Sequence, residues 1–535
     1  MTTLSLADAQ LLPPGQLKQW AYNTLDVTGT LEIAEALLPR LSPNQAAFYA
    51  FERALQAPTM SMMLRGVPVN AFQRNQMITE LKRELKRIER DIANHPVIKE
   101  KWDGVEKDTG LCPGAMGKHH KWPRGVPDDD PSKVCLVCGG SRFRPTAFNG
   151  NSPEQRAHLL YDLLGLPPQS NKDRDITADS DAMVKLAADH PAVRPLLEPM
   201  IEVVDLMKQL GFLDAPLTPD NRYMSTFNVG AAWTGRFSSS KNPKGLGGNL
   251  QNIGARHRRI YIADYGKEMF YADYMQGESN LVAHLSGDER YIEAHAVGDV
   301  HTYVTRYLWP ELPWTGDLAR DKRIAKQNPP WDLAEGHDYR FQCKRIQHGS
   351  NYGLTPTGIS MIAQIPHAAA KVAYERYMTE FPGIPAWQNW VYKRVAEMLP
   401  LTNPLGRTIT LLGRPWDKHT RRQGLAFLPQ SALADIENIA LWRVWAYLEK
   451  EGVELFAQVH DALLGQYPQG RLDLVRAVLQ QMQVPVPITD IHGITRTLTI
   501  GVEAAVGKNW GHRSGDNPHG IDEAPIAEYL RENPL

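Results

Sequence analysis

Hydrophobic residues recur every three or four positions in several stretches of the chain, and this spacing predicts amphipathic helices. The longest such run passes from Met77 through Leu81 and Leu85 to Ile92. Its other positions carry repeated Lys and Arg, a pattern that fits a solvated face and a helix lying along a phosphate backbone equally well. Residues 152–211 also carry a mostly helical pattern, so much of the first half of the chain is predicted to be helical.

A different pattern surrounds Asp273. The residues before it, 268–272, are rich in aromatic and apolar side chains, and they predict a short strand. After it, Glu278 and Leu285 belong to a run with helical spacing, and Gly287 is placed to end that helix. Asp273 is therefore expected where a buried strand turns into a helix.

A second acidic residue, Asp461, lies between two apolar stretches. The residues on either side of the His460–Asp461 pair predict a strand, a tight turn and a returning strand. A charged Asp between buried strands is costly unless something pairs with it. Side by side on one sheet, Asp273 and Asp461 would hold two divalent metal ions in the arrangement used for in-line displacement at phosphorus. One ion would activate a hydroxyl nucleophile, and the other would hold a triphosphate and its leaving pyrophosphate.

Four polar residues are spaced by four positions further along the chain: Arg340, Lys344, His348 and Tyr352. On a helix they form one polar face with two cations. Such a face suits a triphosphate, because Arg offers a fork of donors and Lys offers a point charge. Taken alone, the same pattern also describes an exposed helix with scattered charge.

Residues 234–259 are rich in Gly, Ser and Asn, with Arg interleaved among them. Small polar residues, amides and Arg suit contact with phosphates and with minor-groove edges, which display mainly acceptors. A flexible polar loop has the same composition, so this segment alone does not decide between the two interpretations.

Composition and charge set limits on this picture. A chain of 535 residues is long enough for three or four lobes, and its 42% hydrophobic and 22% charged content is ordinary for a soluble protein. Because 59 Lys and Arg nearly balance 60 Asp and Glu, any nucleic-acid surface must come from local basic clusters. The chain has no apolar run long enough to cross a bilayer and no secretory pattern at its start, so we expect a cytoplasmic protein that does not bind membranes.

Three of the four cysteines lie in one segment that is rich in Gly, Pro, Asp and Lys, and this segment is predicted to lack regular structure. Cys135 and Cys138 form a CxxC pair followed by two glycines, and Cys112 with the pair His119 and His120 lies upstream. Because tetrahedral zinc takes four N or S ligands, we predict a structural zinc held by the three cysteines and one of the two histidines. Unpaired thiols or a redox CxxC are the alternatives.

In this order, these pieces resemble family A DNA polymerases, the DNA polymerase I group and its phage relatives. The resemblance covers nearly all of the chain after about residue 46. Its strongest points are the motifs at 234–236, 249–252, 273–278, 299–302 and 458–461. The fold that it implies is α+β: a right-hand polymerase of thumb, fingers and palm, with an antiparallel palm sheet and a mainly helical thumb and fingers.

The resemblance implies a role for each motif residue. Asp273 and Asp461, with the backbone carbonyl of Tyr274, would bind two catalytic Mg²⁺ ions. The nucleotide-binding residues would be Gln276, Glu278, His301, Arg340, Lys344, His348 and Tyr352, and Glu278 with Tyr352 would exclude a ribose 2′-hydroxyl. The DNA-binding residues would be Arg236, Gln251, Asn252, Arg422, Gln430 and His460.

Several positions depart from the family's pattern. The family usually has Glu after the second Asp, where this chain has Ala462, so a third carboxylate is missing there. A Phe or Tyr is usual where His348 stands, so sugar discrimination and dideoxynucleotide use are expected to differ. Gly277, Asn280 and Ala426 replace a usual Ile, Arg and Asn, respectively. Both metal-binding Asp residues are present, so we expect retained activity with altered fidelity or nucleotide choice.

The resemblance also divides the chain into parts. These are an exonuclease-like remnant at 1–45, a thumb at 46–220 with the cysteine-bearing insertion at 103–144, palm segments at 221–275 and 416–511, fingers at 276–415, and a tail at 512–535. The stretch 22–26 resembles the last motif of the proofreading exonuclease, but the earlier Asp-x-Glu motif is missing from the chain. We therefore expect no intrinsic 3′–5′ exonuclease activity unless another chain supplies the rest.

The expected activity is addition of deoxynucleotides to a primer 3′ end, as in phage DNA replication in the host cytoplasm. The expected partners are primer–template DNA, deoxynucleoside triphosphates and a separate exonuclease or processivity factor, and the insertion would form a DNA clamp or a docking site. A single-subunit RNA polymerase is one alternative, and a catalytically impaired DNA-binding accessory subunit is another. Glu278 and the 458–461 hairpin favour the DNA enzyme, and the two Asp residues argue against an inactive subunit.

Overall fold

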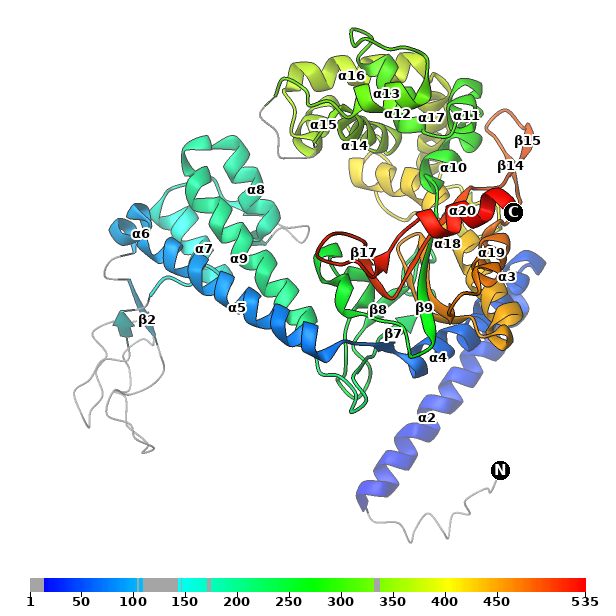
Figure 1. Cartoon of the computed structure of the whole chain (residues 1–535), viewed down its shortest axis with the longest axis horizontal. Coiled ribbons are helices and arrows are strands. Elements are labelled where there is room, and N and C mark those ends of the chain that lie inside the picture. Colours follow the sequence, from blue (N-terminus) through cyan, green and yellow to red (C-terminus); the bar gives the residue numbers. More distant parts are fainter. Residues whose placement is uncertain (1–13, 103–104, 109–142, 146, 171–174, 332–336) are drawn as a thin grey trace.

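The structure is a computed structural model that describes residues 14–102, 105–108, 143–145, 147–170, 175–331 and 337–535. Three groups of elements are visible in Figure 1: a sheet with its covering helices, a helical lobe that contains α5 and α9, and a second helical lobe that contains α12 to α17. Of the helices in those ranges, none is both long and apolar enough to cross a membrane.

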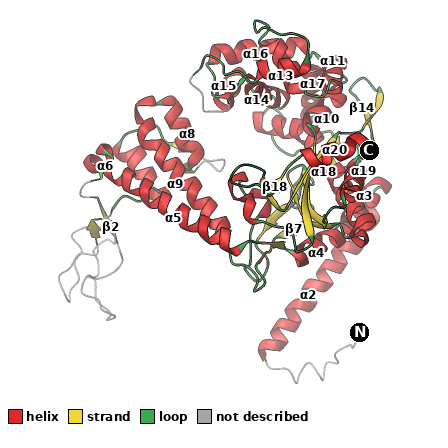
Figure 2. Ribbon diagram, in the orientation of Figure 1, coloured by secondary structure: helices red, strands yellow, loops and turns green. Residues whose placement is uncertain are grey.

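The central sheet has four strands in the order β12, β13, β9, β16, and every neighbouring pair is antiparallel (Figure 2). Its strands are β9 (Lys267–Tyr274), β12 (Glu454–Val459), β13 (Ala462–Pro468) and β16 (Val502–Gly507). The predicted strand before Asp273 and the predicted hairpin around His460–Asp461 are thus both confirmed. Their pairing makes β9 an inner strand, so its last residues are held on both sides.

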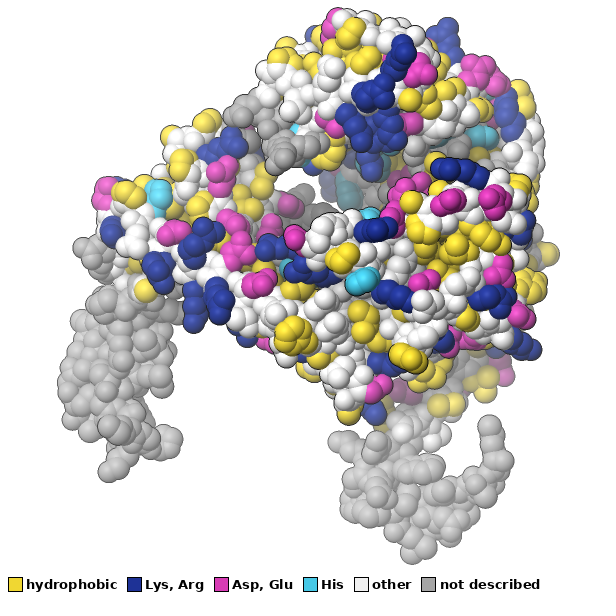
Figure 3. Space-filling model, viewed as in Figure 1, with side chains coloured by type: hydrophobic (Ala, Val, Ile, Leu, Met, Phe, Trp, Pro, Cys, Tyr) yellow, Lys and Arg dark blue, Asp and Glu magenta, His cyan; other side chains and the backbone are white. Residues whose placement is uncertain are grey.

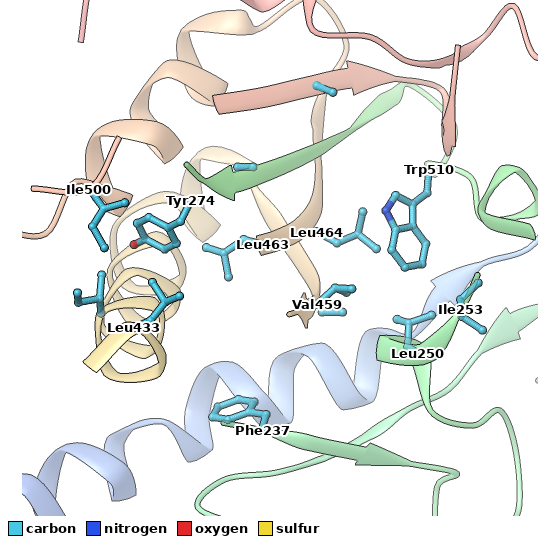
Figure 4. Close-up of a cluster of buried hydrophobic side chains, with 14 of the residues drawn as sticks. Phe237, Leu250, Ile253, Tyr274, Leu433, Val459, Leu463, Leu464, Ile500 and Trp510 are labelled. Atoms are coloured by element: carbon cyan, nitrogen blue, oxygen red, sulfur yellow. The ribbon is translucent and has the colours of Figure 1, made fainter. Parts of the chain in front are cut away.

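Helices α18 (Lys418–Leu448) and α19 (Leu472–Met482) pack against this sheet. Tyr274 and Leu463 from the sheet and Leu433 from α18 belong to the buried cluster in Figure 4. The hydroxyl of Tyr274 donates to the carbonyl of Met482 at the end of α19, at 2.7 Å. Apolar burial on this scale is the main favourable term in folding, and here it fixes the end of β9 against two helices.

The first helical lobe is built on the predicted amphipathic helix, α5 (Ala71–Asn94), whose buried residues include Met77, Leu81, Leu85 and Ile92. The Asn70 side chain accepts from the backbone N–H of Gln73 and so caps its first turn. The rest of the lobe comprises α6 (Pro96–Lys101), α7 (Pro153–Ala157), the π-helix His158–Leu163, β4 (Gln169–Ser170), β5 (Ile176–Thr177), α8 (Ser180–Asp189), the 3-10 helix Pro191–Val193 and α9 (Arg194–Leu213).

The second helical lobe follows β9. Helix α10 (Gly277–Ser286) begins it and ends at Gly287, which adopts a left-handed φ of 65°, as its position in the sequence predicts. The later helices are α11 (Glu289–Ala296), α12 (Val300–Leu308), α13 (Leu318–Ala325), α14 (Tyr339–Asn351), α15 (Pro356–Ala363), α16 (His367–Glu380) and α17 (Gly383–Ala396). Helix α14 is the predicted polar helix, and the Asp338 side chain caps its start.

Short elements connect these parts. Before the first lobe come α2 (Pro14–Leu37), the 3-10 helix Leu38–Arg40, α3 (Pro43–Ala54), α4 (Gln56–Arg65) and β1 (Val67–Pro68). Around the sheet lie β6 (Arg222–Tyr223), β7 (Thr226–Asn228), β8 (Ser238–Ser240), the 3-10 helices Leu250–Asn252, Ala255–Ile260 and Glu449–Glu451, β10 (Leu401–Thr402), β11 (Thr408–Ile409), β14 (Val486–Thr489), β15 (Thr495–Leu498), β17 (Asn509–His512), β18 (Gly520–Ile521) and α20 (Ala524–Glu532).

The cysteine-bearing insertion departs from its prediction at its two ends. Strands β2 (Glu106–Asp108) and β3 (Phe143–Pro145) pair antiparallel there, so the expectation of no regular structure is wrong for these residues. Backbone hydrogen bonding across the base of a long loop closes it without any requirement for periodic sequence. The candidate zinc ligands, Cys112, His119, His120, Cys135 and Cys138, lie outside the described residues.

Gly277 opens α10 at a point where the helix touches α18. A Cβ atom at this position would lie 2.6 Å from Cδ1 of Leu433. We therefore expect Gly277→Ile to lower the free energy of unfolding by roughly 1–3 kcal/mol, because overpacking displaces α10 or α18. Urea denaturation measures this loss, and adding Leu433→Ala should recover part of it. Identical losses with and without Leu433→Ala would contradict the predicted contact.

Candidate active site

The two aspartates expected to bind metal are neighbours in the folded chain. Ala462, at the start of β13, is the register partner of Asp273 on β9. The backbone N–H of Tyr274 donates to the carbonyl of Asp461 at 3.2 Å, which joins the hairpin tip to the end of β9. His460 takes the left-handed φ of 59° that this tight turn requires. The predicted approach of Asp273 and Asp461 therefore occurs.

Both aspartates line one cavity of about 320 Å³. The cavity collects most of the residues that the sequence predicts for metal and nucleotide binding, from β9, α10, α12, α14 and the hairpin tip. Its lining consists of Asp273, Tyr274, Gln276, Gly277, Glu278, Ser279, His301, Lys344, Gln347, His348, Asn351, Tyr352 and Asp461.

The electrostatics of the two carboxyl groups fit a divalent cation. Burial, then the charges of Asp461 and Glu503, raise the pKa of Asp273 to about 7. Burial also raises the pKa of Asp461, against the opposing effect of Arg236. Two neighbouring carboxylates repel each other, and a cation between them removes that repulsion. Carboxylate oxygens and the Tyr274 carbonyl are the hard oxygen ligands that Mg²⁺ accepts.

Arg236 links the hairpin tip to α10. One guanidinium nitrogen, Nη2, donates to Glu278 and to Oδ1 of Asp461, the latter at 3.3 Å. The hydroxyl of Tyr352 donates to the other oxygen of Glu278. Arg236 is thus in direct contact with Asp461, and Glu278 is held between an Arg and a Tyr from two other segments.

The two cations of the predicted polar face of α14, Lys344 and Arg340, have different environments in the structure. Lys344 lines the cavity, and its charge favours the ionised forms of Asp273 and Asp461. Arg340 is absent from the cavity lining and instead makes a two-pronged ion pair with Asp299, with Nε and Nη2 each at 3.0 Å from a carboxylate oxygen. Lys344 is therefore the α14 cation that lines the cavity, whereas Arg340 has two of its guanidinium nitrogens on Asp299.

His301 and His348 occupy different environments. His301 is buried, and its Nδ1 lies 2.6 Å from Oε1 of Gln347. Burial, then the charge of Arg340, lowers the pKa of His301 to about 4, so this ring is neutral at pH 7. His348 lies one turn beyond Lys344, and its ring meets Tyr352 edge-on with centroids 4.7 Å apart. A neutral imidazole at each position can accept or donate a hydrogen bond without adding charge.

The residues predicted to contact DNA lie in two places. Gln251, in the 3-10 helix Leu250–Asn252, donates from Nε2 to the carbonyl of Gln458 at 3.1 Å. Arg236 and the exposed His460 also lie at the hairpin that carries Asp461. Asn252 follows Gln251 in the same short helix, whereas Arg422 and Gln430 are half-buried on α18.

Local basic surface exists despite the balanced total charge. Lys and Arg side chains gather over α13 and the helices beside it in Figure 3. On α13 itself, Arg320, Lys322 and Arg323 are exposed. This lobe also carries Lys344, so an anion that approaches the cavity would pass positive charge.

Two acidic residues near the site were given no site role from the sequence. Glu503 on β16 is the register partner of Asp273, and its charge contributes to the raised pKa of that residue. Glu437 is buried on α18, and burial, then the charge of Asp461, raises the pKa of its carboxyl group well above the usual value. The only sequence signal for Glu437 is an acidic residue within an otherwise apolar helical run, and this signal does not say what the residue faces.

The family profile described as DNA polymerase family A matches residues 141–512. The chain belongs to this family. It is 29% identical over 389 residues to "DNA polymerase I, thermostable" of Thermus aquaticus, covering 68% of this chain and 42% of that protein. It is also 29% identical over 384 residues to DNA polymerase I of Mycobacterium tuberculosis, covering 68% of this chain and 38% of that protein. The chain therefore spans less than half the length of these curated relatives.

A solved structure shares the fold. The POL domain of Pol1 from M. smegmatis, in complex with DNA primer-template and dNTP, aligns with a TM-score of 0.62 at 22% identity. The alignment covers 85% of this chain and 69% of that chain. The predicted fold, an α+β right-hand polymerase with an antiparallel palm sheet and helical thumb and fingers, is confirmed.

Removing the charge of Asp273 should change how the stability of the metal-free protein depends on pH. The folded state keeps a proton on Asp273 up to a pH of about 7, whereas an unfolded chain releases it near pH 4. Because the native state binds the extra proton in this window, this group's contribution to the free energy of unfolding should fall as pH rises from about 4 to 7. Its size is at most a few kcal/mol, at about 1.4 kcal/mol for each pKa unit.

Urea denaturation of the wild type and Asp273→Asn at several pH values measures this contribution. The variant should gain stability relative to the wild type between pH 4 and 7, and Mg²⁺ should reduce the difference by stabilising the ionised wild-type site. Parallel stability curves for the two proteins would contradict the predicted protonation of Asp273.

Proposed function

We propose that this protein is a template-directed DNA polymerase, which adds deoxynucleotides to a primer 3′ end by two-metal phosphoryl transfer and releases pyrophosphate. One observation carries the proposal: Asp273 and Asp461 meet at the end of β9, in a cavity that Lys344 of α14 also lines. Membership of DNA polymerase family A and the names of the similar proteins, which are DNA polymerases, support it.

The metal-binding and cationic residues of the cavity each have a chemical task in this reaction. Asp273, Asp461 and the carbonyl of Tyr274 would hold the two Mg²⁺ ions, which when bound lower the pKa of the primer 3′-hydroxyl and neutralise the triphosphate. Lys344 offers a positive charge to the phosphates. Arg340 would join it by exchanging Asp299 for a phosphate oxygen, since both are acceptors for the same guanidinium fork.

The remaining contacts orient the substrates. The Glu278–Tyr352 hydrogen bond fills space beside the cavity and would exclude a ribose 2′-hydroxyl. Arg236 would release Asp461 when that carboxylate takes a cation, and it keeps Glu278 as a partner. Arg236, Gln251 and His460 then surround the place where the primer end must lie, with Gln276, Asn252, Arg422, Gln430, His301 and His348 in supporting nucleotide and DNA contacts.

Primer extension with deoxynucleotides and Mg²⁺ tests the proposal. The wild type should extend a primer along its template, and Asp461→Ala should lose activity on the order of 10³-fold, because a bound metal supplies several kcal/mol of transition-state stabilisation. Asp516→Asn, at an exposed Asp far along the chain, is the matched control and should keep activity.

Three further outcomes of this assay are decisive. Extension by ribonucleotides alone would identify an RNA polymerase, and DNA binding without extension would identify an accessory subunit. Without deoxynucleotides, a mismatched primer should stay full length, because we propose that proofreading requires a separate exonuclease chain.

We also propose that the insertion at 103–144 binds a structural Zn²⁺ and acts as a DNA clamp or a docking site for a processivity factor. Support comes from the spacing of Cys112, Cys135 and Cys138 with His119 or His120. Metal analysis should find about one zinc per chain, lost in the double variant Cys135→Ser/Cys138→Ser, because a tetrahedral site needs all four ligands. Cys343→Ala should retain zinc, since Cys343 is buried on α14. A zinc-free wild type would refute the site.

A further inference from the structure

Helix α13 exposes three cationic side chains on the lobe that carries α14. They are Arg320, Lys322 and Arg323, which together we call the α13 basic face. Of the three, only Lys322 has an ion-pair partner within the described residues. Figure 3 shows Lys and Arg side chains gathered over this helix and its neighbours. Exposed basic residues on a helix are often no more than a solvated face, so the position of this face relative to the cavity decides its meaning.

Lys322 shares an acidic partner with Arg340. Its Nζ lies 3.9 Å from Oδ2 of Asp299, the oxygen that accepts from Nε of Arg340 at 3.0 Å. The longer distance is near the limit for an ion pair and the Lys322 side chain is 50% exposed, so its ammonium group is held only loosely. Two residues after Asp299, His301 lines the cavity. The two cations on Asp299 therefore lie beside the cavity wall that α12 and α14 form.

Lys322 also lies near the edge of the central sheet. Glu503 on β16 is the register partner of Asp273. Partial burial, then the charge of Glu523, raises the pKa of Glu503, and the charge of Lys322 opposes this rise. Salt screens exposed charges beyond about 10 Å, so this influence requires Lys322 to be near β16. Lys322 is therefore close both to the ion pair at the start of α14 and to the strand beside Asp273.

Phosphate is the anion that this arrangement suits. Lys344 lines the cavity and Arg340 lies one helical turn away, so Lys322 is a third cation beside the place where Asp273 and Asp461 would hold metal ions. An ammonium group is a point charge with three donors, and it binds phosphate oxygens without a fixed orientation. DNA also carries phosphates, but the predicted contacts to the primer end lie at the hairpin tip and in the 3-10 helix beside it. The position of α13 therefore favours a nucleotide polyphosphate.

We propose that the α13 basic face attracts the triphosphate of the incoming nucleotide and the pyrophosphate product, and that Lys322 contacts their phosphate oxygens at the edge of the cavity. The inference rests on the proposed function. Arg320 and Arg323 raise the local concentration of the polyphosphate through the attraction that clustered like charges exert on an oppositely charged ligand. Lys322 is the member of the face that can reach the bound phosphates, because its ammonium group is loosely held beside Asp299.

Incorporation of one deoxynucleotide by a preformed complex of the full chain with primer–template tests this role. The triple variant Arg320→Gln/Lys322→Gln/Arg323→Gln should raise the nucleotide concentration that gives the half-maximal rate by about tenfold at low salt, the lower end of such charge effects. The maximal rate should change little, because the lining of the cavity is intact. Added salt should reduce the difference from the wild type, because it screens exposed charges. Inhibition by pyrophosphate should weaken by a similar factor.

Single variants separate Lys322 from the general charge of the lobe. Lys322→Gln should give the largest single increase in the half-maximal nucleotide concentration, because Lys322 lies nearest the cavity. Lys371→Gln is the matched control, since Lys371 on α16 of the same lobe also lies 3.9 Å from a carboxylate, that of Glu375, and is 60% exposed. It should leave the nucleotide requirement unchanged. Equal increases in Lys322→Gln and Lys371→Gln would overturn the assignment of Lys322 to phosphate contact.

Two further measurements separate this inference from its alternatives. In an anisotropy titration the triple variant should bind labelled primer–template as tightly as the wild type. Weaker DNA binding with an unchanged nucleotide requirement would overturn the inference and assign the α13 basic face to DNA. If the wild type extends a primer and the triple variant needs no more nucleotide than the wild type, only the role of α13 is refuted. A wild type that does not extend a primer would refute the proposed function and this inference together.

Discussion

The repulsion between two carboxylates held at the end of β9 is the constraint around which this structure is built. Asp273 and Asp461 come from segments almost 190 residues apart, and the antiparallel register of β9 with β13 brings them together. Burial, then the negative charges of Asp461 and Glu503, disfavours ionisation and raises the pKa of Asp273 to about 7. Only a rigid support can keep them adjacent, and β9 has a paired strand on each side together with α18 and α19.

Several charged side chains surround Asp273 and Asp461. Arg236 contacts Asp461 directly, Lys344 lines the same cavity, and the charge of Glu278 on α10 acts on Asp461 from the other side of Arg236. Arg340, one helical turn from Lys344, forms an ion pair with Asp299. Arg236 and Arg340 each pair with a carboxylate, so neither of these guanidinium charges is left unpaired in the structure. Local pairing of this kind lets a chain with a net charge of −1 hold several cations around one cavity.

The sequence predicts the local elements of this site well and their partners less well. The strand before Asp273, the helix ending at Gly287 and the hairpin at His460 follow from apolar spacing and turn residues, which are local signals. That Asp273 and Asp461 share one site followed from the cost of an unpaired Asp and from the resemblance. The Arg340–Asp299 pair joins residues 41 positions apart, and helical spacing says nothing about such partners. The same holds for Glu437, whose neighbours come from three other segments.

Two of the departures from the family's pattern, Gly277 and Ala462, can be explained in part by the residues that surround them. Gly277 has no side chain on α10, and Leu433 of α18 occupies the space that a Cβ would need. Ala462 on β13 offers no carboxylate, and the acidic side chains whose charges act on Asp273 and Asp461 are Glu503 of β16 and Glu278 of α10, respectively. The volume and charge of an active centre depend on all the side chains around it. Side chains of neighbouring elements can therefore fill the space beside Gly277 and add acidic groups near Ala462. The effect of Gly277 and Ala462 on the site must therefore be judged together with the residues that surround them.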